Sequence, residues 1–196
     1  MTKLNDNLQQ LLDTFYDYFF LQCSNHVKRN TILCKELLDV KTGKQDANFA
    51  TEDGSYSFFT CSKEVSKCDT AAFNGHAILI AGNGDFNVKH YNGEFNAYQR
   101  TYVLIPNDEL YFGTLYMSSL KLIKKFKRMS TGSIVKFISK SDIENIQVIV
   151  PENKNLLKTL NDYLKVIEKN NLENEHLERL RNKLLPLLIN GQVTIR

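Results

Sequence analysis

The 196-residue sequence lacks the long apolar runs that mark membrane-spanning and exported proteins. No stretch approaches the ~18 consecutive apolar residues that a bilayer-spanning helix needs. The first residues, MTKLNDNLQQLLD, contain no apolar signal core and no small-residue cleavage site. We therefore expect a cytoplasmic protein that has no membrane partner.

The sequence also lacks the motifs of the common enzyme classes. It has no phosphate-binding G-x-x-x-x-G-K-[ST] loop, no G-x-S-x-G nucleophile turn and no H-E-x-x-H zinc helix. Gly82-Asn83-Gly84 follows an apolar segment, but the third glycine of a dinucleotide-binding loop is missing. The three prolines are unpaired, so the Pro-Pro box of an amino-group DNA methyltransferase is absent. Asp53, Asp85 and Glu94 lie in polar loops typical of solvated turns, so we expect no catalytic residues.

The cysteines do not form a metal-binding pattern. They occur at four separated positions, Cys23, Cys34, Cys61 and Cys68, and none makes a C-x-x-C pair. Without a signal peptide, the spacing indicates reduced thiols. A zinc site that combines them with His26, His76 or His90 is disfavoured, because the loop spacing is wrong for zinc ligands. We expect no metal.

The composition is that of a globular protein with a sizeable core. Hydrophobic residues make up 42% of the chain and aromatic residues 11%, which argues against disorder over the whole length. The length allows one domain, or one domain with an extension. The net charge of +3 permits a polyanionic partner without requiring one.

Two segments have helical periodicity and flank the rest of the chain. Apolar residues recur at steps of three and four between Leu4 and Phe19, which predicts a helix from Leu4 to about Gln22. A polar linker follows at residues 25–30. The predicted organisation is a helix over 1–24, a globular domain over 25–151 and a long helix over 152–196.

The long helix is predicted from Leu156 to about Leu188, with Pro186 kinking its last turn and Gly191 ending it. Its alternating steps of four and three are the heptad spacing of a coiled coil. The seam is interrupted by two asparagines, and we expect it to mediate dimerisation through Leu156, Leu160, Tyr163, Ile167, Asn170, Asn174, Leu177 and Leu184. The alternative is that both flanking helices dock on the globular core.

Between the helices, short β-branched and aromatic runs alternate with turn residues. The predicted strands are Tyr56–Thr60, Ala77–Ala81, Thr101–Ile105, Ser133–Ile138 and Ile146–Val150. Asn92-Gly93 predicts a two-residue hairpin turn between Val88–Tyr91 and Glu94–Tyr98. A helix is predicted over Thr114–Met129. The fold class is therefore α+β, a mixed globular domain between a short N-terminal helix and a long coiled-coil-like helix.

Positive charge is concentrated on the predicted helix over 114–129. Lys121, Lys124, Lys125 and Arg128 follow the spacing i, i+3, i+4 and i+7, which places them on one helix face. Like charges so close repel one another, and a polyanion would relieve that repulsion. The alternative is a solvated lysine face.

A second polar cluster lies between Gly82 and Arg100. It is dense in side chains that hydrogen-bond to base edges or stack on bases: Asn83, Phe86, Asn87, Lys89, His90, Tyr91, Asn96, Tyr98, Gln99 and Arg100. Asn and Gln can pair bidentately with adenine, and Arg or Lys with guanine. An ordinary polar hairpin would have the same composition.

The order of these motifs resembles the DNA-specificity subunit of type I restriction-modification systems, from about Ile32 to Gly191. The first three motifs are a strand with a Gly-Lys turn at Val40–Lys44, an aromatic-Thr strand end at Phe58–Thr60, and an apolar strand that leads into a glycine loop at Gly75–Gly84. The last three are a Gln-containing segment before a strand at Tyr98–Thr101, an Ile-to-Pro strand at Ile146–Pro151, and a Leu-rich helix end at Leu180–Gly191. The family usually has two recognition domains and two long helices. This chain has one of each.

The resemblance implies a non-catalytic half-length subunit that reads one DNA half-site. Phosphates would be held by the Lys121–Arg128 face, and specificity would come from the Gly82–Arg100 segment with Lys44. Two copies would pair about a twofold axis through the helices and read a split palindrome. The helices would bind modification (methyltransferase) subunits that carry S-adenosylmethionine, and possibly a restriction subunit. The alternatives are a coiled-coil adaptor whose domain binds protein, and a nuclease with a hidden site.

Overall fold

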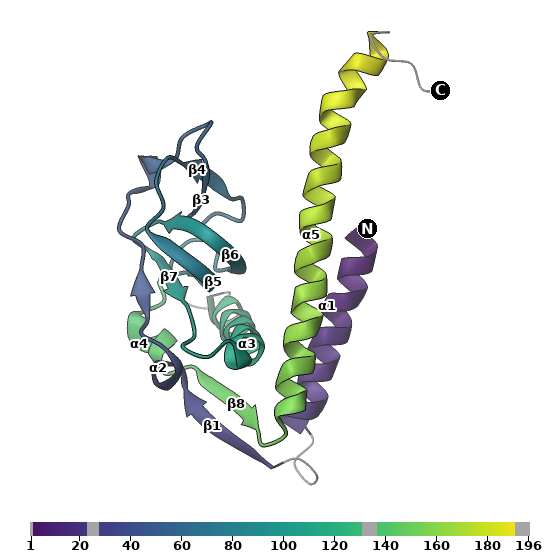
Figure 1. The fold of residues 1–196 in the computed structure, drawn as a ribbon. Helices are drawn as coiled ribbons and strands as arrows, with labels where there is room; N and C mark the ends of the chain where they lie inside the picture. Colours follow the sequence, from purple (N-terminus) through teal and green to yellow (C-terminus); the bar gives the residue numbers. More distant parts are fainter. Residues whose placement is uncertain (1, 23–27, 131–136, 191–196) are drawn as a thin grey trace.

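The computed structural model describes residues 2–22, 28–130 and 137–190, and it contains two helical segments beside a mixed domain (Figure 1). The first segment is α1, Thr2–Tyr16, which continues into a π-helical turn, η1, Asp17–Gln22. The second is α5, Lys154–Ile189. Both predicted flanking helices are therefore confirmed. None of the described helices has a stretch apolar enough to span a bilayer.

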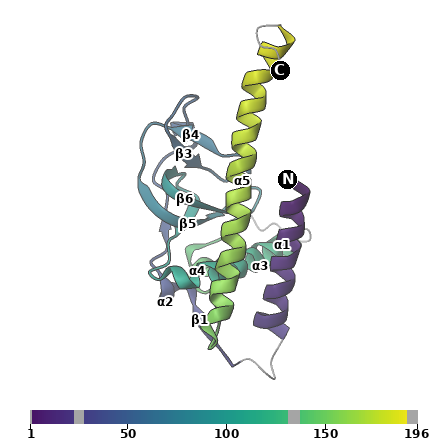
Figure 2. The same cartoon turned by 45° about the vertical axis from the view of Figure 1, so that its right-hand side comes forward.

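The two flanking helices run antiparallel, and α1 covers only the first half of α5 (Figures 1 and 2). Near the start of the chain, Asn5 Nδ2 donates to Asn171 Oδ1 and Asn170 Nδ2 donates to Asn5 Oδ1. Phe15 of α1 packs edge-on against Tyr163 of α5, with ring centroids 5.7 Å apart. The remainder of α5 extends beyond the N-terminus.

The mixed domain contains a six-stranded sheet in the order β2-β7-β5-β6-β3-β4. Its strands are β2 Lys41–Thr42, β3 Tyr56–Phe59, β4 Ser66–Cys68, β5 Phe73–Ala81, β6 Val88–Ala97 and β7 Thr101–Leu104. A separate antiparallel pair, β1 Arg29–Leu33 with β8 Gln147–Pro151, lies below the sheet in Figure 1. The other elements are η2 Ala47–Phe49, η3 Glu109–Tyr111, α2 Cys34–Leu37, α3 Phe112–Ser130 and α4 Lys140–Glu144.

The sheet curls, so that strands far apart in its order come into contact. Strand β6 runs antiparallel to β5 over residues 88–95, and its last residues, 95–97, pair in parallel with β3. The end of β3 then contacts the start of β7, where Thr101 Oγ1 donates to the Phe59 carbonyl at 3.3 Å. This curvature brings several loops to one end of the sheet.

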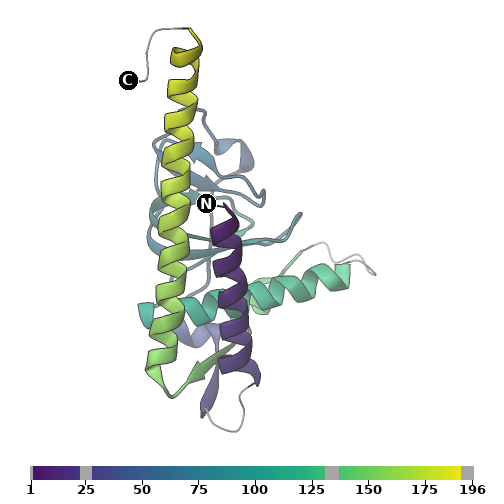
Figure 3. The ribbon, with the colours of Figure 1, turned by 90° about the vertical axis from the view of Figure 1, so that its right-hand side faces the viewer.

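One continuous core joins the helices to the sheet. It contains Leu12 and Tyr16 of α1, Ile78 of β5, Leu115 of α3 and Leu160 of α5, all fully buried. Helix α3 crosses behind the α1–α5 pair in Figure 3 and contacts both helices as well as β8. The mixed domain and the two flanking helices therefore share packing, and the domain limits drawn from the sequence stay a prediction.

The hairpin turn predicted at Asn92-Gly93 is wrong. Strand β6 runs unbroken through both residues, and Gly93 faces Gly75 of β5. A two-residue type I′ turn needs positive φ at both central residues, and only Gly93 has it, at +137°. Pairing along the whole of β5 outweighs the local turn preference. The reversal between β5 and β6 instead occurs at residues 82–87.

The other predicted strands and the predicted helix agree with the structure to within a few residues where it describes them, but the linker predicted over 25–30 is wrong at its end, because β1 begins at Arg29. The strands at 56–60, 77–81, 101–105 and 146–150 correspond to β3, β5, β7 and β8, and the helix at 114–129 corresponds to α3. Helix α5 continues through Pro186 to Ile189. Cys23, His26, most of the predicted strand at 133–138 and the stop at Gly191 lie outside the described residues.

Candidate nucleic-acid interface

Four loops converge at one end of the curled sheet. They are residues 43–45, 60–64, 82–87 and 98–100. Backbone hydrogen bonds tie them together, since Gln99 N donates to the Gln45 carbonyl at 2.9 Å and Gly82 N donates to the Arg100 carbonyl at 2.8 Å. The Cys61 thiol also donates to the Arg100 carbonyl. The loops form one continuous surface.

Two glycines allow this close approach of backbones. A Cβ at Gly43 would lie 2.0 Å from the Ala97 carbonyl oxygen, and one at Gly82 would lie 2.7 Å from that of Arg100. Real Cβ atoms essentially never lie closer than 3.0 Å to such an atom, and both distances are below this limit. Any other residue would therefore push the loops apart.

The exposed side chains of this surface have the chemistry of DNA readers. Lys44, Gln99 and Arg100 are exposed, and Asn83 and Tyr98 are partly exposed. The structure thus brings Lys44 beside Gln99 and Arg100, as expected from the sequence. Amide and guanidinium groups at loop tips can reach base edges, whereas a lysine ammonium can pair with a phosphate.

Three polar residues of the Gly82–Arg100 segment hold the fold together instead. Asn87 Nδ2 donates to the Cys61 carbonyl at 2.9 Å and to that of Asp85 at 2.7 Å. Lys89 donates to the Ser62 carbonyl, and burial lowers its pKa. Asn96 is buried and donates to the Thr70 carbonyl. Their hydrogen bonds position the loops from beneath.

Two aromatic residues of the same segment, Phe86 and Tyr91, are packed inward. Phe86 is 4% exposed and contacts Phe126 of α3, so the expected exposed ring for base stacking is not found. Tyr91 packs against Phe59 and Phe95 of the sheet core. The sequence composition could not distinguish these core rings from stacking rings, because both uses favour the same residue types.

His90 also lies between the sheet and the helices. Its ring contacts Phe112 and Tyr116 of α3 edge-on. Burial, and secondarily the neighbouring His76, lower the pKa of His90 to about 4. The ring is therefore neutral at pH 7 and offers no cation to a phosphate.

The basic face of α3 is confirmed as a single face, but α1 and η1 neutralise part of it. Lys121, Lys124, Lys125 and Arg128 line one hollow together with Asp17. Lys121 pairs with Asp17, and Lys124 pairs with Asp13 at 3.2 Å. In the part of the chain that the structure describes, Lys125 and Arg128 make no such pair. These two cations are the freer ones for a polyanion.

Two cations at the loop surface did not appear in the sequence-based set. Lys63 and Lys127 both pair with Asp85, at 3.3 Å and 3.5 Å, and link the loop at 82–87 to its neighbours. The hydrogen bond from Lys63 lowers the pKa of Asp85 most, with a further contribution from Lys127. Lys127 lies on α3 but not on the helix face formed by Lys121, Lys124, Lys125 and Arg128. Lys63 belongs to none of the motifs found in the sequence.

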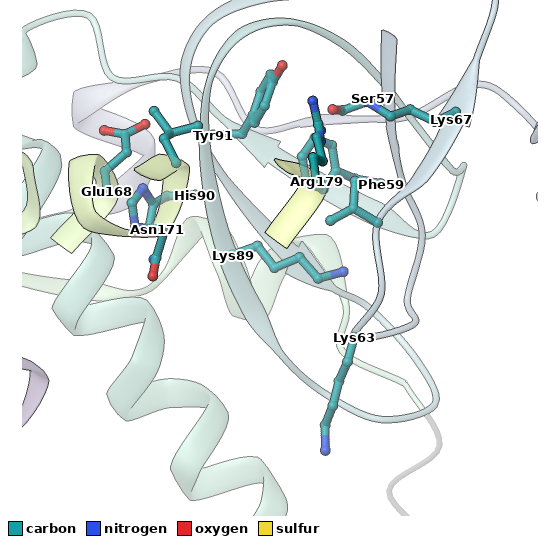
Figure 4. Close-up of a pocket in the computed structure, with 12 residues that line it drawn as sticks. Ser57, Phe59, Lys63, Lys67, Lys89, His90, Tyr91, Glu168, Asn171 and Arg179 are labelled. Atoms are coloured by element: carbon teal, nitrogen blue, oxygen red, sulfur yellow. The ribbon is translucent and has the colours of Figure 1, made fainter. Parts of the chain in front are cut away.

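A groove of about 520 Å³ separates the outer sheet strands from α5 (Figure 4). The sheet side carries mostly cationic and aromatic side chains, and the helix side carries a carboxylate, an amide and a guanidinium group: Phe59, Lys63, Lys67, Lys89, His90, Tyr91, Glu168, Asn171 and Arg179. The Lys89 ammonium lies 5.9 Å from the centre of the Phe59 ring. The groove borders the loop surface through Lys63.

The predicted seam of α5 divides into a covered and an uncovered part. Leu160 and Ile167 are buried in the chain's own core, Leu156 and Tyr163 pack against that core, and Asn170 bonds to α1. In the distal half, residues 172–189, six large apolar side chains are between 39% and 75% exposed: Leu172, Leu177, Leu180, Leu184, Leu185 and Ile189. The sequence suggested a dimerisation surface along the whole seam. In the structure, the chain's own core covers the proximal half of the seam, and the distal half is open.

A loop-built polar surface on a curled sheet, joined to a long helical arm, is the arrangement of the DNA specificity domain of type I restriction-modification systems. The family model of the type I restriction modification DNA specificity domain matches residues 26–179. The chain belongs to that family.

Similar proteins agree with this assignment. The chain is 39% identical over 173 residues to the type I restriction enzyme EcoDI specificity subunit of Escherichia coli, covering 84% of this chain and 38% of that subunit. It is 29% identical over 89 residues to the putative type I restriction enzyme MjaX specificity subunit of Methanocaldococcus jannaschii, covering 44% of this chain and 20% of that subunit.

The fold is shared with solved structures of such subunits. The S subunit of a type I restriction-modification system from M. genitalium superposes with a TM-score of 0.72 at 16% identity, over 94% of this chain and 54% of that one. The HsdS subunit from Thermoanaerobacter tengcongensis gives 0.57 at 15% identity, over 98% and 53%. The present chain therefore spans about half the length of its structural relatives.

Proposed function

We propose that this chain reads one half of a split DNA site and works in pairs, each copy supplying one recognition domain. It carries no chemistry of its own. S-adenosylmethionine and the catalytic residues belong to a methyltransferase subunit that docks on the helices, with or without a restriction subunit. Each part of this proposal depends on a different surface of the molecule.

DNA reading is the part that the loop surface supports. Lys44, Gln99 and Arg100 project from loops joined by backbone hydrogen bonds, so the backbone positions from which they extend are held together. Amide and guanidinium donors of this kind can discriminate base edges at about 1–3 kcal/mol per good bidentate contact. The single observation that carries the proposal is this convergence of four loops in a chain of the specificity-domain family.

Pairing is supported by the distal half of α5. It leaves an apolar stripe open over about 18 residues, or about 27 Å at ~1.5 Å per residue. A stripe of this length is costly to leave in water. A second copy running antiparallel would cover it, and its twofold symmetry would make the site a palindrome interrupted by a spacer.

The deciding experiment maps methylation on DNA exposed to the cognate modification subunit, with and without this chain. A split palindromic motif that appears only with the chain supports the proposal. An asymmetric motif means that a different half supplies the second domain and refutes the paired copies. No motif, with the modification subunit active on its usual partner, refutes DNA reading by this chain.

A second experiment separates positioning contacts from base contacts. Lys125→Ala with Arg128→Ala should weaken binding to all DNA sequences and flatten the salt dependence by roughly 0.9 for each phosphate that is no longer neutralised. The matched control is Lys121→Ala, whose cation already pairs with Asp17 and should change the salt slope less. An unchanged slope in the double variant would remove α3 from the interface.

Substitution at the loop tips should change preference rather than overall affinity. Gln99→Ala and Arg100→Ala should each cost about 1–3 kcal/mol on the preferred site and little on other sequences. Asn74→Ala, an exposed amide at the opposite end of β5, is the control. Uniform weakening on every sequence would place the reading surface elsewhere.

A further inference from the structure

A cluster of two histidines and a glutamate lies between the sheet and α5, apart from the loop surface. His76 on β5 and His90 on β6 are diagonal neighbours on one sheet face, because His76 pairs with Asn92 and Ile78 pairs with His90. Glu168 comes from α5 and borders the same groove as His90 (Figure 4). One ligand atom from each of the three residues lies within 4.8 Å of the other two.

Two of the imidazole nitrogens in this cluster have nothing to bond to. His76 Nε2 and His90 Nδ1 are buried and, among the residues that the structure describes, have no hydrogen-bond partner. Buried polar atoms are almost always satisfied, so two unpaired nitrogens on rings whose centroids lie 6.1 Å apart point to a missing ligand. Imidazole nitrogen is the commonest protein ligand for transition metals.

The orientation of His76 is already that of a metal ligand. Its Nδ1 pairs with the Glu109 carboxylate, and the ring stacks on Phe112 at 3.4 Å between centroids. With the proton on Nδ1, the unpaired Nε2 keeps its lone pair and can bind a metal. A carboxylate that fixes the second nitrogen of a ligating histidine is a recurrent feature of zinc sites.

We propose that His76, His90 and Glu168 bind one zinc ion, which ties the β5–β6 pair to α5. Two neutral imidazoles and one carboxylate form a known zinc ligand set that leaves the fourth position for water. Ligand atoms about 3.4 Å apart would suit bonds of about 2.0–2.1 Å, so the side chains close inward by roughly 1 Å on binding. The groove gives the ion and its water a way in.

This ion would supply a link that the apo structure lacks. The main described contacts of α5 are with α1, α3, β8 and η3 rather than with β5 or β6. A metal bridge would fix the recognition sheet directly to the helical arm. The expectation of no metal was based on the spacing of the cysteines as zinc ligands. None of the three ligands proposed here is a cysteine.

The test is zinc binding by the full chain after removal of metal with a chelator, followed by calorimetry and by Co²⁺ absorption. We expect one zinc per chain, a visible Co²⁺ spectrum of tetrahedral type, no response to Mg²⁺, and a higher melting temperature with zinc. His90→Gln and Glu168→Gln each remove a direct ligand and should weaken binding about 100-fold or more, beyond the 10–100-fold loss typical of a residue that only orients a ligand. Glu109→Gln, which only positions His76, should weaken it about 10–100-fold.

Matched controls use the same residue types away from the cluster. His176→Gln and Glu173→Gln change exposed side chains of α5, and Cys61→Ser removes a partly exposed thiol. All three should bind zinc like the parent chain. Glu168→Gln is isosteric and only partly buried, so it remains informative if His90→Gln does not fold. Absence of stoichiometric binding, full binding by both cluster variants, or loss of binding in a control would overturn the proposal.

Discussion

The two halves of α5 have the same heptad spacing but opposite surroundings. In the proximal half, residues 154–171, the seam packs on α1, α3 and β8, and Leu160 is completely buried. In the distal half, residues 172–189, the seam positions Leu177 and Leu184 are each 44% exposed. The difference teaches that a heptad pattern shows what must be covered. It does not show whether the same chain or another one provides the cover.

The largest expected effect comes from a substitution that disrupts the packing of the proximal half of α5. Leu160→Ala removes a fully buried side chain from the shared core and should lower the free energy of unfolding by about 2–5 kcal/mol. Urea denaturation at a concentration that keeps the chain monomeric measures it. Leu177→Ala is the control and should cost less than about 1 kcal/mol. Equal losses would mean that the two halves are equally packed within one chain.

The next largest effect comes from substitutions in the distal half of α5, which should disrupt self-association. Leu177→Lys with Leu184→Lys places two charges in the open stripe and should weaken self-association at least 100-fold, about 2.7 kcal/mol. Sedimentation equilibrium measures the change, while thermal unfolding of the monomer should stay the same. His176→Lys with Asn182→Lys adds the same charge outside the seam and should leave association intact. A double variant that still forms the same dimer would place the interface elsewhere.

A smaller effect tests how α1 is fixed over the proximal half. The buried Tyr16 hydroxyl and Ser118 Oγ are hydrogen-bonded at 3.0 Å, and burial raises the pKa of Tyr16. Tyr16→Phe leaves the Ser118 hydroxyl unpaired and should cost about 0.5–1.5 kcal/mol of stability. Tyr18→Phe, at an exposed position, should cost nothing measurable. Equal values for the two variants would contradict the anchoring role of Tyr16.

The smallest effect lies at the boundary between the halves. Asn170→Ala removes the bond to Asn5, which is only partly buried, and should cost about 0.5–1 kcal/mol. Asn174→Ala, one turn further along α5, should cost less in the monomer. A double-mutant cycle of Asn5 and Asn170 measures the pair directly. If Asn174→Ala were the costlier change in the monomer, the boundary would lie further along α5.

The loop surface shows where sequence reasoning succeeds and where it stops. It grouped Lys44 with Gln99 and Arg100, and the structure brings the loops that carry them together, while their role in DNA reading stays a prediction. It could not separate Phe86, which belongs to the core, from rings that stack on bases. It missed Lys63, because only the folded chain brings residue 63 beside Asp85.

The sequence alone determined the helical periods, most of the strands and the class of protein, since these depend on local patterns and on the order of motifs along the chain. The tertiary structure decided the continuous course of β6 through Gly93, the pairing of Lys121 and Lys124 with the N-terminal helical segment, and the meeting of His76, His90 and Glu168. The physical reason is the same in each case. Long-range pairing and packing energies exceed the local preferences of single residues, and a sequence read locally contains only those preferences.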